Sequence, residues 1–265
     1  MSHLPSILEL LDLEYIEENI YRSCVTFTEP HTLFGGQVAA QALYAAGKTA
    51  PAGRAPHSLH GYFLRAGDPR RPTLFRVDRD RDGGAFSARR VVAIQNGEVI
   101  FNMAASFAHP RVVDEPLLDR DAEPAGPFPE VDDLPVHTYR RHPSFEFRHE
   151  DSPHRLPERF WIRCLEPLPA PEEDPLLHDA ILTYISDIST GLIPLEPRGY
   201  TASSSIDHAV WFHRPSRMNG WIWQHMRAET IAGGRGWYTG ALYTPDGTRV
   251  ASIAQESLFR KAPTA

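Results

Sequence analysis

The amino-acid sequence predicts an α+β fold made of two similar units in tandem, each with one long helix against an antiparallel sheet. The glycine pairs 83–84 and 233–234 are separated by the same number of positions as the turn pairs 96–97 and 246–247. Self-similarity at a fixed spacing indicates an internal duplication. In both copies, one helical stretch precedes several runs of β-rich composition. Two such sheets could pair edge to edge, which would protect their exposed edges.

The first unit is expected to begin with a short helix, because Ser6 and Glu9 have the spacing of a capping box. A strand is expected over residues 20–27 and a helix over residues 36–48. The start of that helix is rich in glycine, which permits either close packing or the close approach of a ligand to free N–H groups. Asn96-Gly97 lies between alternating apolar runs, a pattern typical of a tight hairpin with left-handed backbone geometry.

The second unit repeats this order, with a strand expected over residues 159–165 and a helix over residues 177–189. Helical spacing gives this helix one apolar stripe, formed by Leu177, Ala180, Ile181, Tyr184, Ile185 and Ile188. Asp187 lies on the flank of the stripe, where burying a carboxylate is costly. Asp246-Gly247 predicts a second tight hairpin.

A linker over residues 111–157 is expected to join an N-terminal unit, residues 1–110, to a C-terminal unit, residues 158–265. Nine prolines lie between Pro110 and Pro157 inclusive, among many charges and with little periodicity. A segment of this composition is predicted to bury little surface.

Composition restricts the classes of function. The 265 residues are 42% hydrophobic and 23% charged, as in an ordinary globular protein. The net charge of −7 argues against binding to nucleic acid or to a membrane surface. No apolar run is long enough to cross a bilayer, and neither end carries a recognisable targeting signal, so a cytoplasmic location is expected. Cys24 and Cys164 are expected to be free thiols.

Sequence signatures of several enzyme classes are absent. The patterns G-x-S-x-G and H-E-x-x-H do not occur, and neither do the glycine patterns of nucleotide-binding loops. Four histidines lie in or beside the proline-rich segment, but their spacing fits no set of metal ligands: His137, His142, His149 and His154. We therefore expect neither a metal nor a cofactor.

Five longer motifs occur in an order that resembles one enzyme family. They are LFGGQVAAQALYAA, HSLHGYFLRAGDPRRP, GGAFSARRVVAIQNG, SIDHAVWFHRP and VASIAQESLFR. From about residue 7 to residue 260, the chain resembles the acyl-CoA thioesterase II family. The resemblance implies a double hotdog fold whose two sheets are joined edge to edge. It also implies hydrolysis of fatty acyl-CoA to a free fatty acid and CoA.

The resemblance further implies a site in the second unit that holds and activates the attacking water. The implied residues are Asp187 in YISDIS, Ser205 in SSSIDH and Gln255 in SIAQES. Ser203 is the nearest rival of Ser205, because alternate residues of a strand point to the same side. A carboxylate can act as a general base, and a hydroxyl and a carboxamide can orient water without carrying charge. Read without the resemblance, Asp187 and Ser205 have ordinary structural roles at a helix end and in a strand, and Gln255 is equally consistent with a buried structural amide and a functional group.

Residues around this trio add further predictions about the site. Asp207 and His208 are expected to tie their strand to its neighbours. The helix of the first unit has Gln41 where a matching acid would stand, which predicts one active site per chain. Partial burial is expected to raise the pKa of Asp187.

The remaining expectations concern the substrate and two alternative functions. Arginines near the motifs are candidates for binding the CoA phosphates: Arg65, Arg70, Arg71, Arg89, Arg90 and Arg214. One alternative is a hotdog hydratase or dehydratase acting on acyl thioesters, which usually pairs a histidine with a carboxylate, and no histidine flanks Asp187 in register. The other is a non-catalytic acyl-CoA-binding protein, which the presence of all three residue types disfavours. The resemblance also implies a homo-oligomer, either a dimer or a tetramer.

Overall fold

The computed structural model describes residues 4–28, 31–109, 128–152, 156–192 and 200–261. Within these residues, fourteen strands form one sheet with antiparallel pairing. The N-terminal half contributes β1 (Leu13–Glu17), β2 (Ile20–Ser23), β3 (Ala55–Phe63), β4 (Leu74–Asp82), β5 (Phe86–Gln95) and β6 (Glu98–Ala108). The C-terminal half contributes β7 (Val136–His137), β8 (Phe145–Arg148), β9 (Arg159–Cys164), β10 (Tyr200–Ser205), β11 (Asp207–Phe212), β12 (Ile222–Ala232), β13 (Arg235–Tyr243) and β14 (Arg249–Lys261).

The two halves meet at the middle of the sheet. The strand order is β1-β2-β4-β5-β6-β3-β11-β14-β13-β12-β9-β8-β7, and β10 pairs with β14. Strands β3 and β11 form the junction, with Ala209 opposite His60. Each of these strands would otherwise present unpaired N–H and C=O groups at the edge of its own half. The sheet is therefore continuous across the internal repeat.

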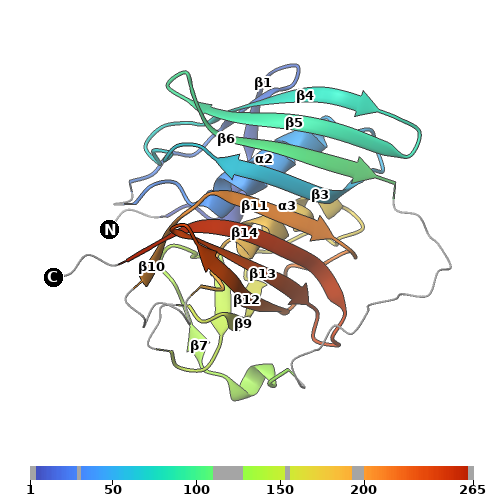
Figure 1. Ribbon diagram of the computed structural model, residues 1–265. Helices are drawn as coiled ribbons and strands as arrows, with labels where there is room; N and C mark the ends of the chain where they lie inside the picture. The colour runs from blue at the N-terminus through green and yellow to red at the C-terminus, as the bar shows by residue number, and fades with distance from the viewer. Residues whose placement is uncertain (1–3, 29–30, 110–127, 153–155, 193–199, 262–265) are drawn as a thin grey trace.

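Two long helices cover one face of this sheet. They are α2 (Gly35–Lys48) and α3 (Pro175–Ser186), and they lie side by side behind the central strands in Figure 1. A short helix, α1 (Ile7–Leu11), packs against both, and a 3-10 turn spans Val131–Asp133. One core cluster contains buried side chains from both halves, among them Phe75, Phe101, Ile181 and Phe259.

The close contact between α2 and α3 depends on small residues. Ala39, Ala42 and Ala46 of α2 are completely buried. A Cβ atom at Gly36 would lie 2.5 Å from the carbonyl oxygen of Tyr184 on α3, so a larger residue requires the helices to move apart. Close packing is therefore the correct interpretation of the glycine-rich helix start at Gly36.

The predicted elements agree with the structure except near their ends. The capping box of Ser6 and Glu9 is present at α1. Helix α2 begins one residue before the predicted start, and β2 ends at Ser23, earlier than predicted. Helix α3 ends at Ser186 rather than at residue 189, so Asp187 is its C-cap residue and not an interior residue.

The two predicted hairpins differ in their turns. Asn96 and Gly97 have φ values of 53° and 78°, so both take the left-handed conformation that the Asn-Gly pair predicts between β5 and β6. In the turn between β13 and β14, Gly247 takes that conformation, with φ of 85°. Asp246 contributes to this turn through its carboxylate, which accepts a hydrogen bond from the backbone N–H of Thr248 at 3.3 Å.

The prediction that residues 111–157 bury little surface is wrong for residues 142–149. Phe145 and Phe147 lie on β8, point into the main core and are almost fully buried. His142 is also buried, with its Nδ1 atom 3.0 Å from the hydroxyl of Tyr184. The alternation of apolar and charged residues in FEFR is a strand signal that the surrounding prolines conceal.

Further expectations concern cysteines and membranes. Cys24 is exposed, Cys164 is buried, and both are free thiols as predicted. Over the ranges described above, no helix is both long and apolar enough to span a membrane.

Candidate active site

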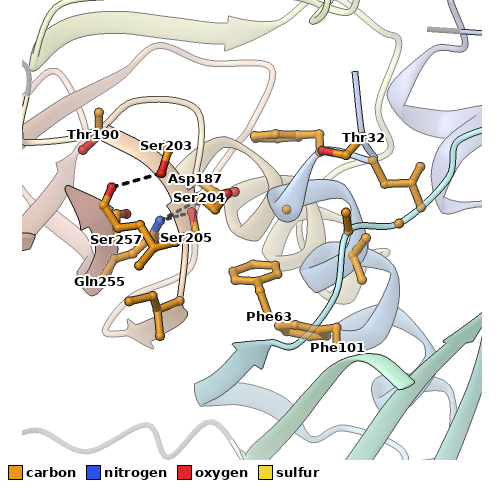
Figure 2. A pocket seen from close by; sticks show the side chains of 18 of the residues that line it. Thr32, Phe63, Phe101, Asp187, Thr190, Ser203, Ser204, Ser205, Gln255 and Ser257 are labelled. Atoms are coloured by element: carbon orange, nitrogen blue, oxygen red, sulfur yellow. Dashed lines mark hydrogen bonds between the residues drawn. The ribbon is translucent and has the colours of Figure 1, made fainter. Parts of the chain in front are cut away.

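A cavity of about 640 Å³ opens where the two halves of the sheet meet the start of α2. One wall comes from the N-terminal half and is mainly apolar, with Leu33, Phe34, Val38, Phe63, Ile100 and Phe101. The facing wall comes from the C-terminal half and is rich in hydroxyl groups, with Thr190, Ser203, Ser204, Ser205 and Ser257. Figure 2 shows Phe63 and Phe101 on one side and Asp187, Ser205 and Gln255 on the other. Both halves are therefore needed to build the cavity.

Asp187 lies at the cavity wall, between the end of α3 and the beginning of α2. Its position as C-cap residue directs the side chain toward the first turn of α2, where the backbone N–H of Gly36 donates to the carboxylate. Phe34, the N-cap residue of α2, makes no side-chain capping hydrogen bond. The Asp187 carboxylate therefore occupies the positive end of a helix that has no cap of its own, a favourable place for an anion.

Gly35 keeps the space beside this carboxylate open. A Cβ atom at position 35 would lie 2.6 Å from Oδ2 of Asp187 and 2.9 Å from the ring of Phe63. The glycine-rich helix start thus serves two purposes, helix packing at Gly36 and access to the carboxylate at Gly35.

Gln255 brings the three predicted site residues together. Its Nε2 group donates to Oδ1 of Asp187 at 2.9 Å and to Oγ of Ser205 at 2.6 Å. Gln255 is only 2% exposed, because it lies on β14 between β13 and the segment leading into β11. Because the oxygen of Ser205 accepts this bond, its hydroxyl proton remains available for donation into the cavity.

Ser203 does not take the place of Ser205. Its hydroxyl donates to the carbonyl oxygen of Leu258 at 3.4 Å, away from Gln255. The pairing of β10 with β14 shifts register between Ala202 and Ser205, so simple strand alternation does not hold there. Residues 203–206 consequently all line the cavity, but Ser205 is the one that contacts Gln255.

The surroundings of Asp187 shift the pKa of its carboxyl group in opposite directions. Burial raises the pKa of this carboxyl group, whereas the charge of His208, the hydrogen bonds from Gln255 and Gly36, and the charge of Arg141 lower it. The net direction is upward, as the sequence predicts. A carboxylate with a raised pKa is a stronger base than an ordinary aspartate.

The neighbours Asp207 and His208 tie β11 to its surroundings, as predicted. Asp207 accepts the backbone N–H of Glu256 at 2.7 Å and contacts Nε2 of His60 at 3.1 Å. His208 is completely buried and forms hydrogen bonds with Gln255 and Ser186. No local sequence pattern indicates that His208 contacts a residue of the trio, because that contact joins two strands and a helix end.

Most of the predicted CoA-binding arginines are engaged elsewhere. Arg89 is almost completely buried and pairs with Asp82 at 2.8 Å. Arg70 pairs with Asp68 of its own loop, and Arg90 of β5 pairs with Asp80 of the neighbouring β4. Arg71 donates to Asn96, and Arg214 donates to the carbonyl oxygen of Arg249. Arg65 does line the cavity, where it also pairs with Glu98.

A second arginine at the cavity was missed by the sequence analysis. Arg141 lies in the proline-rich segment, donates to the carbonyl oxygen of Thr32 at 2.6 Å and stacks over the ring of Phe34. It lines the cavity and contributes positive charge near Asp187. No sequence signal singles it out, because it follows Arg140 in a segment with little periodicity.

Gln41, the residue that the sequence offers in place of a matching acid, has a packing role in the N-terminal half. Gln41 of α2 is buried and donates to the carbonyl oxygen of Leu10 at 2.6 Å, so it holds α1 against α2. In the part of the chain that the structure covers, no three histidine, cysteine or acidic side chains gather as a metal site would require. His154, one of the four histidines considered above, lies outside the described residues.

Comparison with protein families agrees with this geometry. Residues 26–108 match the acyl-CoA thioesterase N-terminal domain, and residues 114–259 match the acyl-CoA thioesterase C-terminal domain. A protein from Alicyclobacillus acidocaldarius described as having a hot dog fold matches with a TM-score of 0.73 at 18% identity, covering 97% of this chain and 98% of that chain. This likeness shows that the chain has a hotdog fold.

Individual relatives match over nearly the whole chain. Acyl-coenzyme A thioesterase 8 from Rattus norvegicus is 32% identical, over 97% of this chain and 89% of the relative. Acyl-CoA thioesterase 2 from Haemophilus influenzae is 30% identical, over 97% and 98% respectively. The crystal structure of acyl-CoA thioesterase II TesB2 from Mycobacterium marinum has 38% identity and a TM-score of 0.79, covering 97% of this chain and 99% of that one. With both of its halves matched and the trio assembled at one cavity, this chain belongs to the acyl-CoA thioesterase family.

Proposed function

We propose that this protein hydrolyses fatty acyl-CoA to a free fatty acid and CoA, and that Asp187, Ser205 and Gln255 hold and activate the attacking water. The observation that carries the proposal is the arrangement of Gln255, which binds the carboxylate of Asp187 and the hydroxyl of Ser205 at once. Such an arrangement places a base and a hydroxyl donor at the wall of the same cavity. Family membership supports the same reaction, because the relatives are named as thioester hydrolases.

In this mechanism, Asp187 takes a proton from water as the water oxygen attacks the thioester carbonyl. The Ser205 hydroxyl orients the same water, and the first-turn N–H groups of α2 polarise the carbonyl oxygen. The carbon–sulfur bond of the tetrahedral intermediate then breaks. The CoA thiolate leaves with the proton returned from Asp187, and the acyl group leaves as a carboxylic acid. No covalent acyl-enzyme is formed.

The two walls of the cavity suit the two parts of the substrate. The apolar wall around Phe63 and Phe101 offers a surface for the acyl chain. Arg65 and Arg141 supply positive charge for the phosphates of CoA, since guanidinium groups pair well with phosphate oxygens. The proposed substrate binding therefore uses residues from both halves of the chain.

A hydratase or dehydratase is a weaker candidate. His208 does approach the trio, but it is completely buried and is not among the residues that line the cavity. A histidine in that position cannot exchange a proton with a bound acyl chain. The non-catalytic alternative is weaker as well, because Asp187, Ser205 and Gln255 are all present and joined by hydrogen bonds.

Three further expectations are part of this proposal. We propose that the hotdog fold is a double hotdog, with one unit over residues 1–110 and a second over residues 158–265. A homo-oligomer and a cytoplasmic location remain predictions from the sequence.

The proposal is tested by following release of free thiol from acyl-CoA substrates of varied chain length. Asp187→Asn should lower kcat by about 10²- to 10⁴-fold, the usual contribution of a general base. Asp179→Asn is the matched control, because Asp179 is a buried acid on the same helix that does not line the cavity. Unchanged turnover in Asp187→Asn would contradict the assignment of the base. No thiol release by the wild-type protein with any chain length would favour a binding protein.

A further inference from the structure

The side-chain amide of Gln255 can donate to both of its partners at the site in only one of its two orientations. Its Nε2 group donates to Asp187 and Ser205, at 2.9 Å and 2.6 Å. If the amide were rotated by half a turn, its oxygen would face the carboxylate of Asp187, and both donated bonds would be lost. Because the two orientations have the same shape, packing alone cannot choose between them. A hydrogen-bond partner at the other end of the amide has to do so.

That partner is His208. Its Nδ1 atom forms a hydrogen bond with Oε1 of Gln255. An amide oxygen can only accept, so Nδ1 must carry a proton. His208 is 0% exposed and Gln255 is 2% exposed, so water does not compete for this bond.

Ser186 satisfies Nε2 of His208 whether or not that nitrogen carries a proton. Its hydroxyl oxygen lies 2.7 Å from Nε2 of His208 and 2.8 Å from the carbonyl oxygen of Thr183. When His208 is neutral, the Ser186 hydroxyl donates to Nε2, which leaves the ring proton on Nδ1. When His208 is protonated, Nε2 donates to Ser186, and the hydroxyl turns to the Thr183 carbonyl. In both states an N–H group faces Gln255.

These contacts form a closed ring of interactions. It runs from Asp187 to Gln255, then to His208 and Ser186, and Ser186 is bonded through the backbone to Asp187. A ring of this kind fixes the base and the amide relative to each other. Burial lowers the pKa of His208, which favours its neutral form.

We infer that His208 is a positioning residue, which holds the Gln255 amide in the orientation that serves Asp187 and Ser205, while Ser186 satisfies the other ring nitrogen of His208. The inference rests on the proposed function, since it assigns a task to a residue behind the proposed site. His208 does not line the cavity and acts through Gln255 alone. Two buried residues outside the trio thereby become part of the catalytic arrangement.

The kinetic test compares two substitutions of His208. In His208→Asn, the side-chain amide nitrogen can occupy the position of Nδ1 and keep the donor. In His208→Gln, the amide group is displaced toward the position of Nε2. We expect His208→Gln to lower kcat about tenfold to hundredfold with little change in KM, and His208→Asn to stay within about threefold of wild type. Equal, wild-type activity of both variants would overturn the inference.

A double-mutant cycle shows whether His208 acts through Gln255. In a Gln255→Ala background, His208→Gln should have no further effect on kcat, because the amide that it orients is gone. A full additional loss in that background would place the effect of His208 elsewhere and contradict the inference.

A measurement without substrate separates this inference from the proposed function. The ¹⁵N chemical shifts of the His208 ring in the wild-type protein should show protonated Nδ1 and unprotonated Nε2 at neutral pH. Protonated Nε2 with unprotonated Nδ1 in the wild type would reject the inference, even if the protein hydrolyses acyl-CoA. The expected tautomer in a protein that releases no thiol would instead reject the proposed function.

Discussion

At the scale of single residues, the surroundings of Asp187 influence the pKa of its carboxyl group in opposite directions. The carboxylate is desolvated, which favours the protonated form, yet it also accepts N–H groups from Gln255 and Gly36, which favour the charged form. Its location at the start of α2 adds the favourable field of a helix N-terminus. The net direction of the pKa is upward, so the ionised carboxylate is a stronger base than that of a solvated aspartate.

The pH dependence of hydrolysis should report this balance. The rate should rise with pH as Asp187 loses its proton, and the midpoint of that rise should lie above the ordinary aspartate value of 3.8. The measurement is kcat/KM for thiol release across a pH series, restricted to the range in which the protein stays folded. A rise centred at or below 3.8 would show that Asp187 is not the group that titrates.

The adjacent glycines of α2 should respond differently to a methyl group. In Gly35→Ala, the new Cβ would crowd Oδ2 of Asp187, so we expect kcat to fall by about tenfold or more with little change in stability. In Gly36→Ala, the Cβ would meet the backbone of α3, so we expect a loss of about 1–3 kcal/mol of unfolding free energy. Thiol release and urea unfolding of both variants check this contrast, and identical behaviour of the two would contradict it.

At the scale of elements, the segment around β8 belongs to the core. Phe145 and Phe147 face α3 and its neighbours, and the ring of Phe145 stacks on Tyr184 at 5.4 Å between centroids. The same segment places Arg141 at the cavity. A stretch with many prolines can therefore contain one short strand that both stabilises the second half and completes the site.

Substitution in β8 should be as costly as in any central strand. Phe147→Ala should reduce the free energy of unfolding by about 3–5 kcal/mol, because a completely buried aromatic ring is removed. Val136→Ala is the control, since Val136 lies on the neighbouring strand β7 but is 54% exposed. Chemical denaturation of both proteins measures the difference. Equal stability of Phe147→Ala and the wild type would show that β8 does not contribute to the core.

Local patterns predicted the elements well and their ends less well. The helical stripe, the Asn-Gly turn and the capping box depend on neighbours in the sequence, and they were found at the expected places. The role of Asp187 as a C-cap residue, the buried β8 and the position of Arg141 depend on contacts between distant segments. The trio itself came from resemblance to a family, since helix and strand periodicity alone favoured structural roles for Asp187 and Ser205 and left the role of Gln255 open. The ring through His208 and Ser186 needed the tertiary structure.

At the scale of the whole molecule, two buried titratable groups give folding stability opposite pH dependences. Burial raises the pKa of Asp179 to about 8, from an ordinary value of 3.8, so the folded chain holds this proton more tightly than the unfolded chain. Burial lowers the pKa of His142 to about 3, from 6.5, so the folded chain holds that proton less tightly. Between pH 3.8 and about 8, Asp179 therefore makes the free energy of unfolding fall as the pH rises. Between about pH 3 and 6.5, His142 makes it rise with pH.

Above pH 6.5, His142 is mostly unprotonated in both the folded and the unfolded chain. Of these two groups, only Asp179 then still makes stability depend on pH. The free energy of unfolding should therefore decrease between pH 6.5 and 8, by up to about 1.4 kcal/mol per pH unit from this group. Asp179→Asn should remove that decrease, because asparagine stays neutral. Urea unfolding of the wild type and the variant across this range measures the slope. Parallel pH dependences would show that another group is responsible.

The continuous pairing of β3 with β11 also bears on how the site behaves at low protein concentration. The two walls of the cavity are parts of one covalent chain. Their local concentration is therefore fixed by the connection between them and not by the amount of protein in solution. A cleft shared by two separate polypeptides would come apart on dilution. Here, the joining of the two halves in one chain keeps both walls together at any dilution.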